Sequence, residues 1–576
     1  MKMNLLPHNR ETGSGLLVTI VMMAIALAAL AAAMAWSANT TRLNERTIQY
    51  TRSLAAAEAN TEAVIAQIAR DFWSSGAKTV FEGSNTYRNI VLTNGTVWKG
   101  WEFSDANNNA QKTFVDIGSY TNYIELDSIY AGLRGYVCPI KVVSNARLTN
   151  TIQNVVGTVA QSFQLTSIPI FQFAMFSSGD MEISCGQPFK ITGKVHANKN
   201  LYVEPDKELT FESDVTAVGD ILFQRHPLDD RSPPAGVAVY KERKEAHVPS
   251  LTLPIGTNNS PLAIREIIQK PPVGEAVSSP MGKQRYYNLA DLIITVTGGG
   301  TNPTITASTG IPFSPKKNVS SSTLKKFAYV NTNFFDWREK KRVRPLELDI
   351  KELTAWSTTI SWFGSRAVSS IYVSDQRVLA ATELAAVRLR NGTNLPANGL
   401  TVVTARPLYV WGHYNQKSLL NLGTTNTTTT VPASIVADAI TVLSTNWQDS
   451  NSMNLVQNRN AKPTTVNAAL LTGSVDTTLG LYSGGMENFP RFMETWDLAN
   501  TFTYNGSMVK MFPSQYATNT WENKTNVYSP PARAWAYDLN FDVGTKLPPL
   551  TPSVQRLMRG QWAALAPYKT TNSPGF

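Results

Sequence analysis

Hydrophobic residues are concentrated near the start of the chain, in a stretch without charge. The uncharged run extends from Thr12 to Thr41, and its apolar part is Gly15–Trp36. About 20 apolar residues in a helix span the hydrocarbon core of a bilayer, whereas the apolar part of a secretory signal has about 7–15. The pattern therefore predicts a helix that spans the lipid bilayer through residues 15–36. A cleavable signal is the alternative, because Ala33–Ala35 fits a small-residue cleavage site.

The hydrophobic pattern then takes helical spacing without a break. Residues 42–73 contain neither proline nor glycine. Apolar or small residues recur there on one helical face, while charged residues fill the other positions. We expect one helix from about Gly15 to Phe72, whose second half leaves the membrane and packs on a folded domain. The residues of the repeating face are Leu43, Thr47, Tyr50, Leu54, Ala57, Thr61, Val64, Ile68 and Phe72.

Beyond Gly76 the helical pattern gives way to short apolar runs that end at Gly, Asn or Asp. Such runs are typical of strands, so the expected fold is mainly β with a long N-terminal helix. Short strands with small or Asn corners favour a β-solenoid for part of the β-rich body, with a β-sandwich as the alternative. The predicted parts are a helical segment (14–76), a β or α+β module (77–170), a solenoid-like body (171–225 and 331–515), a loop-rich insertion (226–330) and a C-terminal strap with a short helix (516–576).

Charge refines the expected location. The chain of 576 residues has a formal net charge of +10, yet only 16% of its residues are charged. Its basic residues are dispersed apart from Arg338–Arg344, so we expect no nucleic-acid partner; a basic surface near an anionic membrane or cell-wall polymer fits better. Lys2 and Arg10 precede the apolar run, which favours a cytoplasmic N-terminus. The protein is then a single-pass inner-membrane protein whose body is periplasmic or at the cell surface.

Candidate chemistry is sparse. The five histidines lack metal-ligand spacing, and no nucleophile elbow or phosphate-binding loop occurs, so we expect neither metal, cofactor nor catalytic residue. Paired acids on adjacent coils could still cleave a polysaccharide, and we considered Glu182 and Asp375 beside the acids named next. The candidates for a carbohydrate groove are Asp180, His196, Asp220, His413 and Asp438. A structural role is favoured for each, since Asp stabilises turns and such a His usually bonds to a turn backbone.

The two cysteines leave two alternatives open. Cys138 and Cys185 both lie in strand-like sequence. In an oxidising compartment they can form one disulfide. Two buried free thiols are the equally weighted alternative.

The N-terminal 70 residues resemble those of PilX-type minor pilins and related pilin-like proteins. The resemblance rests on a leader that ends in Glu-Thr-Gly before Ser14, on the apolar helix, and on the sequence AAAEAN at Ala55–Asn60. It implies a leader of residues 1–13, cleavage between Gly13 and Ser14, and assembly with other pilin-like subunits. One feature departs from the family, because the glutamate usual at the fifth mature position is Val18 here.

A second resemblance covers most of the chain. An ordered set of segments is similar to large bacterial envelope proteins with PilX-like N-termini, which we associate with Verrucomicrobia and neighbouring phyla. It implies an envelope or pilus-system component and implies no activity. The expected function is thus a non-catalytic, pilin-like structural component of a type IV pilus, a type II secretion-like system or another envelope assembly. A membrane-anchored carbohydrate-binding or carbohydrate-cleaving β-helix protein is the alternative. The segments are Gly193–Val203, Phe334–Lys341, Val387–Asn415, Pro432–Asp449, Gly484–Trp496 and Leu547–Pro552.

Overall fold

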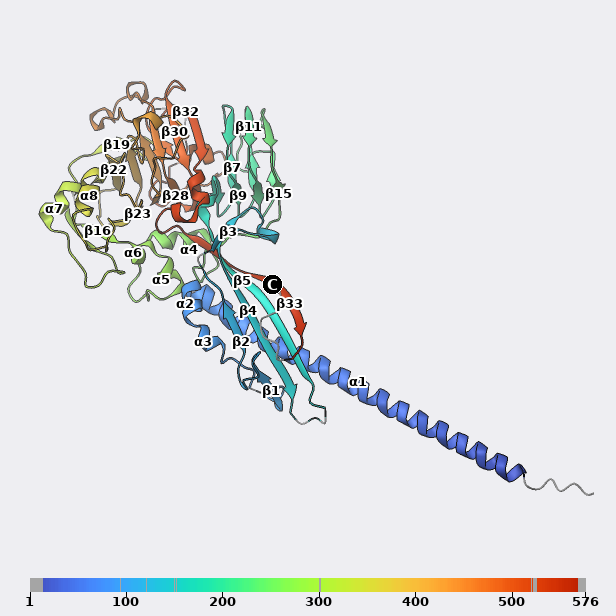
Figure 1. Ribbon diagram of the computed structural model, residues 1–576. Coiled ribbons are helices and arrows are strands. Elements are labelled where there is room, and N and C mark those ends of the chain that lie inside the picture. The colour runs from blue at the N-terminus through green and yellow to red at the C-terminus, as the bar shows by residue number, and fades with distance from the viewer. Residues whose placement is uncertain are drawn as a thin grey trace, which may run out of the picture.

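A computed structural model of the chain describes residues 14–567, except residues 94, 121, 150, 152, 300, 301, 520 and 522–525. The expected leader, residues 1–13 with Gly13, lies outside the described residues. The molecule has three parts (Figure 1): a long N-terminal helix, an antiparallel sheet beside the second half of that helix, and a body of mainly parallel sheets beyond it. We call the second part the head sheet and residues 170–550 the body.

Helix α1 runs from Ser14 to Ser75, 62 residues without interruption. At about 1.5 Å per residue it is roughly 90 Å long. It ends at Gly76, whose positive φ of 80° takes the chain out of the helix and suits glycine. The single helix predicted from the spacing is confirmed.

The head sheet lies against the second half of α1. In the described part of the chain it has six antiparallel strands in the order β1-β4-β5-β33, with β2 and β3 also paired to β4. The apolar face of α1 is buried on β4 and β5, where Val64, Ile68 and Phe72 have no exposed surface. The elements are α2 (Ala77–Glu82), α3 (Ser84–Tyr87), β1 (Trp101–Ser104), β2 (Phe114–Ile117), β3 (Asn122–Glu125), β4 (Arg134–Leu148), β5 (Val156–Pro169) and β33 (Ser553–Leu565).

The C-terminal segment differs from the prediction. The described residues of 516–576 contain no α-helix, only two 3-10 turns, and residues 553–565 form strand β33 where the sequence predicted a closing helix. β33 pairs with β5 from Ser553 opposite Pro169 to Leu565 opposite Thr158, with a bulge after Arg559. The free edge of β5 supplies hydrogen-bond partners over this length, and such tertiary pairing overrides a weak local preference for helix.

The first part of the body is a stack of short parallel strands. Met175 pairs with Val195, and Val195 pairs with Val215, so the chain returns to the same sheet every 20 residues. Two further sheets repeat this offset beside the first. The strands are β6 (Met175–Ser177), β7 (Met181–Ile183), β8 (Phe189–Ile191), β9 (Val195–Ala197), β10 (Leu201–Val203), β11 (Glu208–Phe211), β12 (Val215–Ala217), β13 (Ile221–Leu222), β14 (Val237–Tyr240) and β15 (Lys244–Glu245).

The second part of the body extends the sheet that contains β6, β9, β12 and β15, adding strands beyond β6. The described strands follow the order β15-β12-β9-β6-β31-β28-β25-β23-β21-β16-β17, and a neighbouring sheet follows β18-β20-β22-β24-β26-β29. The elements are β16 (Leu292–Thr297), β17 (Thr304–Thr309), β18 (Ala328–Tyr329), β19 (Phe334–Asp336), β20 (Lys341–Asp349), β21 (Ser370–Asp375), β22 (Glu383–Arg390), β23 (Leu400–Thr404), β24 (Leu408–Trp411), β25 (Ala433–Ala437), β26 (Ile440–Leu443), β27 (Thr464–Asn467), β28 (Ala469–Ser474), β29 (Arg491–Phe492), β30 (Thr501–Gly506), β31 (Met508–Pro513) and β32 (Ala532–Tyr537).

The two stacks meet where β6 pairs with β31, so Met175 lies opposite Met508. We call this contact the joint. The segment 226–330, expected as a loop-rich insertion, contains strands β14–β18: β14 and β15 continue the first stack, and the chain then crosses to β16 and β17 at the other end of the large sheet. Short helices lie in this segment and beside the second stack: α4 (Pro261–Arg265), α5 (Pro280–Gln284), α6 (Tyr286–Leu289), α7 (Ser321–Phe327) and α8 (Ile350–Ser357). Single 3-10 turns are Ser128–Tyr130, Ile170–Gln172, Glu266–Ile268, Leu419–Asn421, Asp449–Asn451, Val456–Asn458, Met486–Asn488, Leu539–Asp542 and Gly544–Lys546.

The coarse fold class is confirmed: a long N-terminal apolar helix followed by a β-rich body. Parallel pairing within the body distinguishes its sheets from the antiparallel sheets of a β-sandwich. One continuous apolar cluster fills the space between the body sheets.

Candidate functional site

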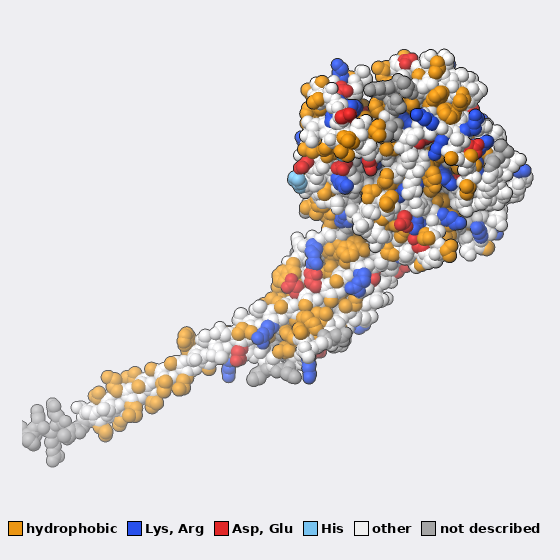
Figure 2. All heavy atoms as spheres, turned by 180° about the vertical axis from the view of Figure 1, so that it is seen from behind, with side chains coloured by type: hydrophobic (Ala, Val, Ile, Leu, Met, Phe, Trp, Pro, Cys, Tyr) orange, Lys and Arg blue, Asp and Glu red, His pale blue; other side chains and the backbone are white. Residues whose placement is uncertain are grey.

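The first half of α1 projects from the molecule with its apolar side chains uncovered. Figure 2 shows them along the projecting rod. Leu16 and Trp36 are each 73% exposed, and Arg42 is the first charged residue after Ser14. By length and composition the helix can cross a membrane. An apolar surface of this size normally contacts lipid or another protein.

The second half of α1 is fixed to the head sheet by the segment Ala55–Asn60. Ala56 and Ala57 are buried in a small apolar cluster with Phe103 of β1, Ala146 of β4 and Val159 of β5. Just before this segment, a Cβ added at Gly157 of β5 would collide with the helix backbone at Ser53 and Leu54, so glycine is needed on the strand side of this contact. Asn60 is fully buried and donates to Thr113 Oγ1 at 2.8 Å and to Ser144 Oγ at 2.9 Å.

Asp180 and Asp220 lie at successive corners of the first stack. Asp180 Oδ1 accepts a hydrogen bond from the backbone N–H of Asn200 (3.0 Å), and Asn200 Oδ1 accepts one from the backbone N–H of Asp220 (2.9 Å). The three residues are 20 apart, the same offset as that between the paired strands of the stack. This ladder ties neighbouring corners together, whereas the role favoured from the sequence was stabilisation of each turn through the backbone of the same turn.

His196 lies inside the first stack. It is 2% exposed, and its ring stacks on Phe176 with ring centroids 5.5 Å apart. Thr216 Oγ1 lies 2.9 Å from Nδ1 and Asn198 Oδ1 lies 3.0 Å from Nε2. Burial lowers the pKa of His196 to about 4, so the ring is neutral at pH 7. A neutral ring with both nitrogens occupied and no open surface is part of the core.

The other candidates have structural partners as well. The backbone N–H of Thr465 donates to His413 Nδ1 at 3.0 Å, and burial lowers the pKa of His413. Asp438 is fully buried and accepts from Arg265 Nη2 at 2.7 Å and from backbone N–H groups of the turn after β31. Asp375 forms a buried ion pair with Arg377. Apart from the ladder that links Asp180 to Asp220 through Asn200, no hydrogen bond or ion pair among the described residues joins one of these candidates to another.

An acid cluster that the sequence did not predict lies beside the joint. Carboxylate oxygens of Glu182, Glu204 and Asp229 lie within 4.8 Å of one another. Only Glu182 was considered from the sequence. The 20-residue offset pairs Glu182 with Tyr202, so Glu204 lies two residues further along, just after β10. Asp229 belongs to the loop after β13, and no local pattern places that loop against the stack.

Two arginines compensate the acid cluster. Arg225 Nη1 and Arg231 Nη2 lie 3.2 and 3.3 Å from Glu204 Oε2, and Arg231 also pairs with Asp229 at 2.6 Å. Burial and the neighbouring Glu182 raise the pKa of Glu204 to about 8. Burial also raises the pKa of Glu182, which accepts from Thr477 Oγ1 at 2.8 Å. The negative charge of the cluster is therefore reduced by the raised pKa of Glu204 and offset by the two guanidinium groups.

A groove opens beside this cluster at the joint. It consists of two cavities of about 340 and 190 Å³, which share Gln187, Glu487, Leu498 and Arg533. Glu487 is buried, which raises its pKa, and it accepts from Tyr482 at 2.9 Å. Trp521 also lines the groove. Acids and aromatic rings thus meet in one cleft, although Glu182, Glu204 and Asp229 lie behind its wall and do not line it.

The two cysteines are free and buried. Cys138 lies in the apolar cluster between α1 and the head sheet, whereas Cys185 belongs to the cluster of the body. Burial raises the pKa of Cys138 to about 11 and that of Cys185 to about 12, so both remain thiols at neutral pH. Of the two alternatives that the sequence left open, the structure has the free thiols.

Known proteins show little similarity to this chain in sequence or in structure. No family model matches the chain, and no curated protein matches it. Among solved structures, the crystal structure of the competence-associated pilin ComZ from Thermus thermophilus matches at 10% identity, over 90% of this chain and 97% of that chain, with a TM-score of 0.28. A TM-score this low does not establish a shared fold.

Proposed function

We propose that this protein is a membrane-anchored, pilin-like structural subunit of an envelope assembly of the type IV pilus or type II secretion-like kind, without catalytic activity. The observation that carries the proposal is the division of α1 into two halves. Its first half is uncharged and projects uncovered, while its second half is packed on an antiparallel sheet. A continuous rigid rod of this kind joins a membrane segment directly to a folded head.

In the proposed arrangement residues 15–36 lie in the inner membrane, the N-terminus is cytoplasmic, and the body is periplasmic or on the cell surface. The resemblance of the leader and of AAAEAN to PilX-type proteins supports processing at Gly13–Ser14 and contact with other pilin-like subunits. Val18 in place of the usual glutamate fits a subunit of specialised position. The packing of Ala56, Ala57 and Asn60 supports the proposed role of the AAAEAN segment, because these residues fix α1 to the head sheet.

We infer that the body is a β-solenoid in two runs, 171–225 and 331–515, joined through the segment 226–330. Support comes from the 20-residue register of β6, β9 and β12 and from the parallel pairing of β21, β23, β25, β28 and β31. Residues 77–170 act as the pilin-head-like module, and residues 516–576 return the chain to it. A stiff stack of this kind suits a spacer or display element.

The test is the intact mass of the protein extracted from membranes. A chain that begins at Ser14 supports prepilin processing, and the variant Gly13→Val should then retain its leader. A chain that begins at Met1 leaves a plain single-span anchor and refutes the pilin-type processing. A soluble chain that begins near Trp36 refutes the anchor itself. As a second arm, Ala28→Arg places a charge at the centre of the span, which costs about 2.5–3.5 kcal/mol and should lower the membrane-bound fraction.

A second candidate function is carbohydrate binding or cleavage by the anchored body. It is favoured by the groove at the joint, where Glu487 lies with Tyr482 and Trp521. A buried acid that holds its proton can act as a general acid on a glycosidic oxygen. The assay is release of reducing ends from soluble envelope polysaccharide by the purified full chain. Release of reducing ends by the wild type that is lost in Glu487→Gln supports carbohydrate cleavage at the groove. If the wild-type protein releases no reducing ends, the cleavage function is refuted.

A further inference from the structure

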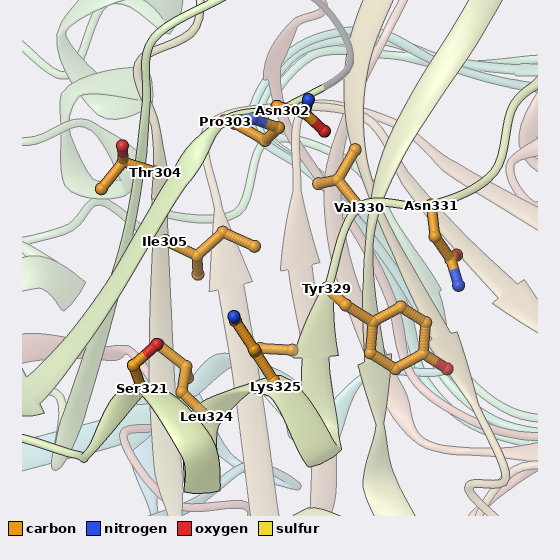
Figure 3. A pocket seen from close by; sticks show the side chains of 11 residues that line it. Asn302, Pro303, Thr304, Ile305, Ser321, Leu324, Lys325, Tyr329, Val330 and Asn331 are labelled. Carbon is orange, nitrogen blue, oxygen red and sulfur yellow. The ribbon is translucent and has the colours of Figure 1, made fainter.

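A second cavity lies at the end of the body that is formed by the last strands of the two large sheets. It encloses about 630 Å³ and is lined by β17, α7, β18 and the residues that follow β18. Figure 3 shows Ile305 of β17 and Val330 on opposite sides of the opening, with Lys325 of α7 between them. β17 ends the order of the 11-stranded sheet, and β18 ends that of its neighbour.

The edge of β17 that faces this cavity has an unused backbone position. Along β17, the carbonyl of Ala307 accepts from Val319 N and the N–H of Thr309 donates to the carbonyl of Lys317, both at 2.8 Å and both on the side away from β16. Because backbone groups alternate sides along a strand, Ile305 also directs its N–H and C=O away from β16. No described residue bonds to them there. An open strand edge of this kind is a template for another strand.

The walls of the cavity suit an extended chain with alternating side chains. Ile305, Leu324 and Val330 supply apolar surface, and Lys325 supplies an exposed ammonium group. Successive residues of an extended strand point to opposite sides, so apolar side chains can meet the wall while polar ones meet Lys325 and solvent.

The charge around the cavity selects the occupant. Lys316 and Lys317 precede α7 and Lys325 and Lys326 lie in its last turn, all four exposed. Within the part of the chain that is described, none of them forms an ion pair with an acid. A second copy of this end would bring like charges together, which disfavours self-pairing across the cavity. An acidic strand would be attracted to it.

We propose that this end of the body binds an extended, acidic segment of a partner protein, which adds as a strand to the edge of β17. The segment donates to and accepts from the backbone of Ile305, and a carboxylate of the segment pairs with Lys325. The inference goes beyond the proposed structural role and does not depend on membrane anchoring, because the cavity lies in the body. The proposed contact lies at β17, the end of the second stack that is farthest from the joint.

The experiment measures binding of a fluorescein-labelled peptide in which glutamate and valine alternate, with the full chain in detergent and fluorescence anisotropy as the readout. Saturable binding that weakens as salt is raised is expected. Lys325→Glu should weaken it about tenfold or more. Ile305→Pro should weaken it by a similar factor, because proline removes the free N–H but no bond to β16. Ile305→Val, which keeps the N–H, is the matched control and should bind as the wild type does.

Two further measurements keep the proposal falsifiable. Hydrogen exchange at the Ile305 amide should slow when the peptide is added to the wild-type protein, which tests the strand pairing without any variant. Absence of saturable binding up to about 1 mM peptide overturns the proposal. Equal binding by Ile305→Pro and the wild type, or full competition by oligogalacturonate with no protection of the Ile305 amide, also overturns it, because the lysines would then bind polyanions of any kind.

Discussion

Replacement of Asp438 separates a structural role from a catalytic one. Its side chain is fully buried after β25, where it accepts from Arg265 at 2.7 Å, from the Ser514 hydroxyl, and from the backbone N–H groups of Gln515 (2.8 Å) and Tyr516 (3.0 Å). Asp438→Ala leaves the Arg265 guanidinium, whose side chain is 2% exposed, without its counter-charge. It also removes the acceptor for the turn after β31.

Breaking a buried ion pair by removing one partner costs about 3–5 kcal/mol. We therefore expect Asp438→Ala to lower the free energy of unfolding of the second stack by about 4 kcal/mol. With a urea m-value of about 3 kcal/mol/M or more, the midpoint falls by up to roughly 1.3 M. The assay is urea unfolding of the detergent-solubilised full chain, followed by tryptophan fluorescence.

The matched control is the double variant Arg265→Met/Asp438→Ala. It has no unpaired buried charge, so it should recover about 1–3 kcal/mol of the loss. An Asp438→Ala midpoint within about 0.2 M of the wild type would refute the structural reasoning and return Asp438 to the groove candidates.

Three other predictions follow from buried groups. The pKa of His196 is about 4 in the folded protein and about 6.5 in the unfolded chain, so burying the neutral ring makes a pH-dependent contribution of about 3 kcal/mol to the free energy of unfolding. This contribution is present above pH 6.5 and is lost as the pH falls towards 4. The urea midpoint of His196→Gln should therefore fall less than that of the wild type over this pH range, and equal falls would contradict the assignment. Phe72→Ala leaves a cavity between α1 and the head sheet and should cost about 3–5 kcal/mol, seen as faster proteolysis within residues 56–75 and disproved by an unchanged rate. Cys138 and Cys185 should react with a thiol reagent only after unfolding, and rapid reaction of either in the native protein would show that its cluster is open.

The bounds of α1 could be predicted because their causes are local. An uncharged apolar stretch, helical spacing and the absence of proline and glycine act within a few turns of the chain, and Gly76 ends the helix at its own position. The corner positions of Asp180 and Asp220 could be predicted locally because each follows a glycine, whereas their bonds to Asn200 join residues 20 apart.

The candidate sites depended on contacts that no local pattern contains. The acid cluster joins Glu182 to a loop at Asp229 and to Thr477, and its arginines follow no repeat that marks them as partners. His196 and Asp438 could be read as functional or structural from the sequence. Burial and the surrounding donors decided between the two roles.

By itself, the sequence determined the long helix, its apolar half and the alternation of short strands that makes the body mainly β. The tertiary structure alone decided that residues 553–565 form β33, because the free edge of β5 lies almost 400 residues earlier in the chain. It also decided that Met175 meets Met508 at the joint and that the outer edge of β17 is covered at Ala307 and Thr309 but open at Ile305. Strand pairing is satisfied by whichever edge the folded chain brings near, so its partners are set by the whole topology and not by neighbouring residues.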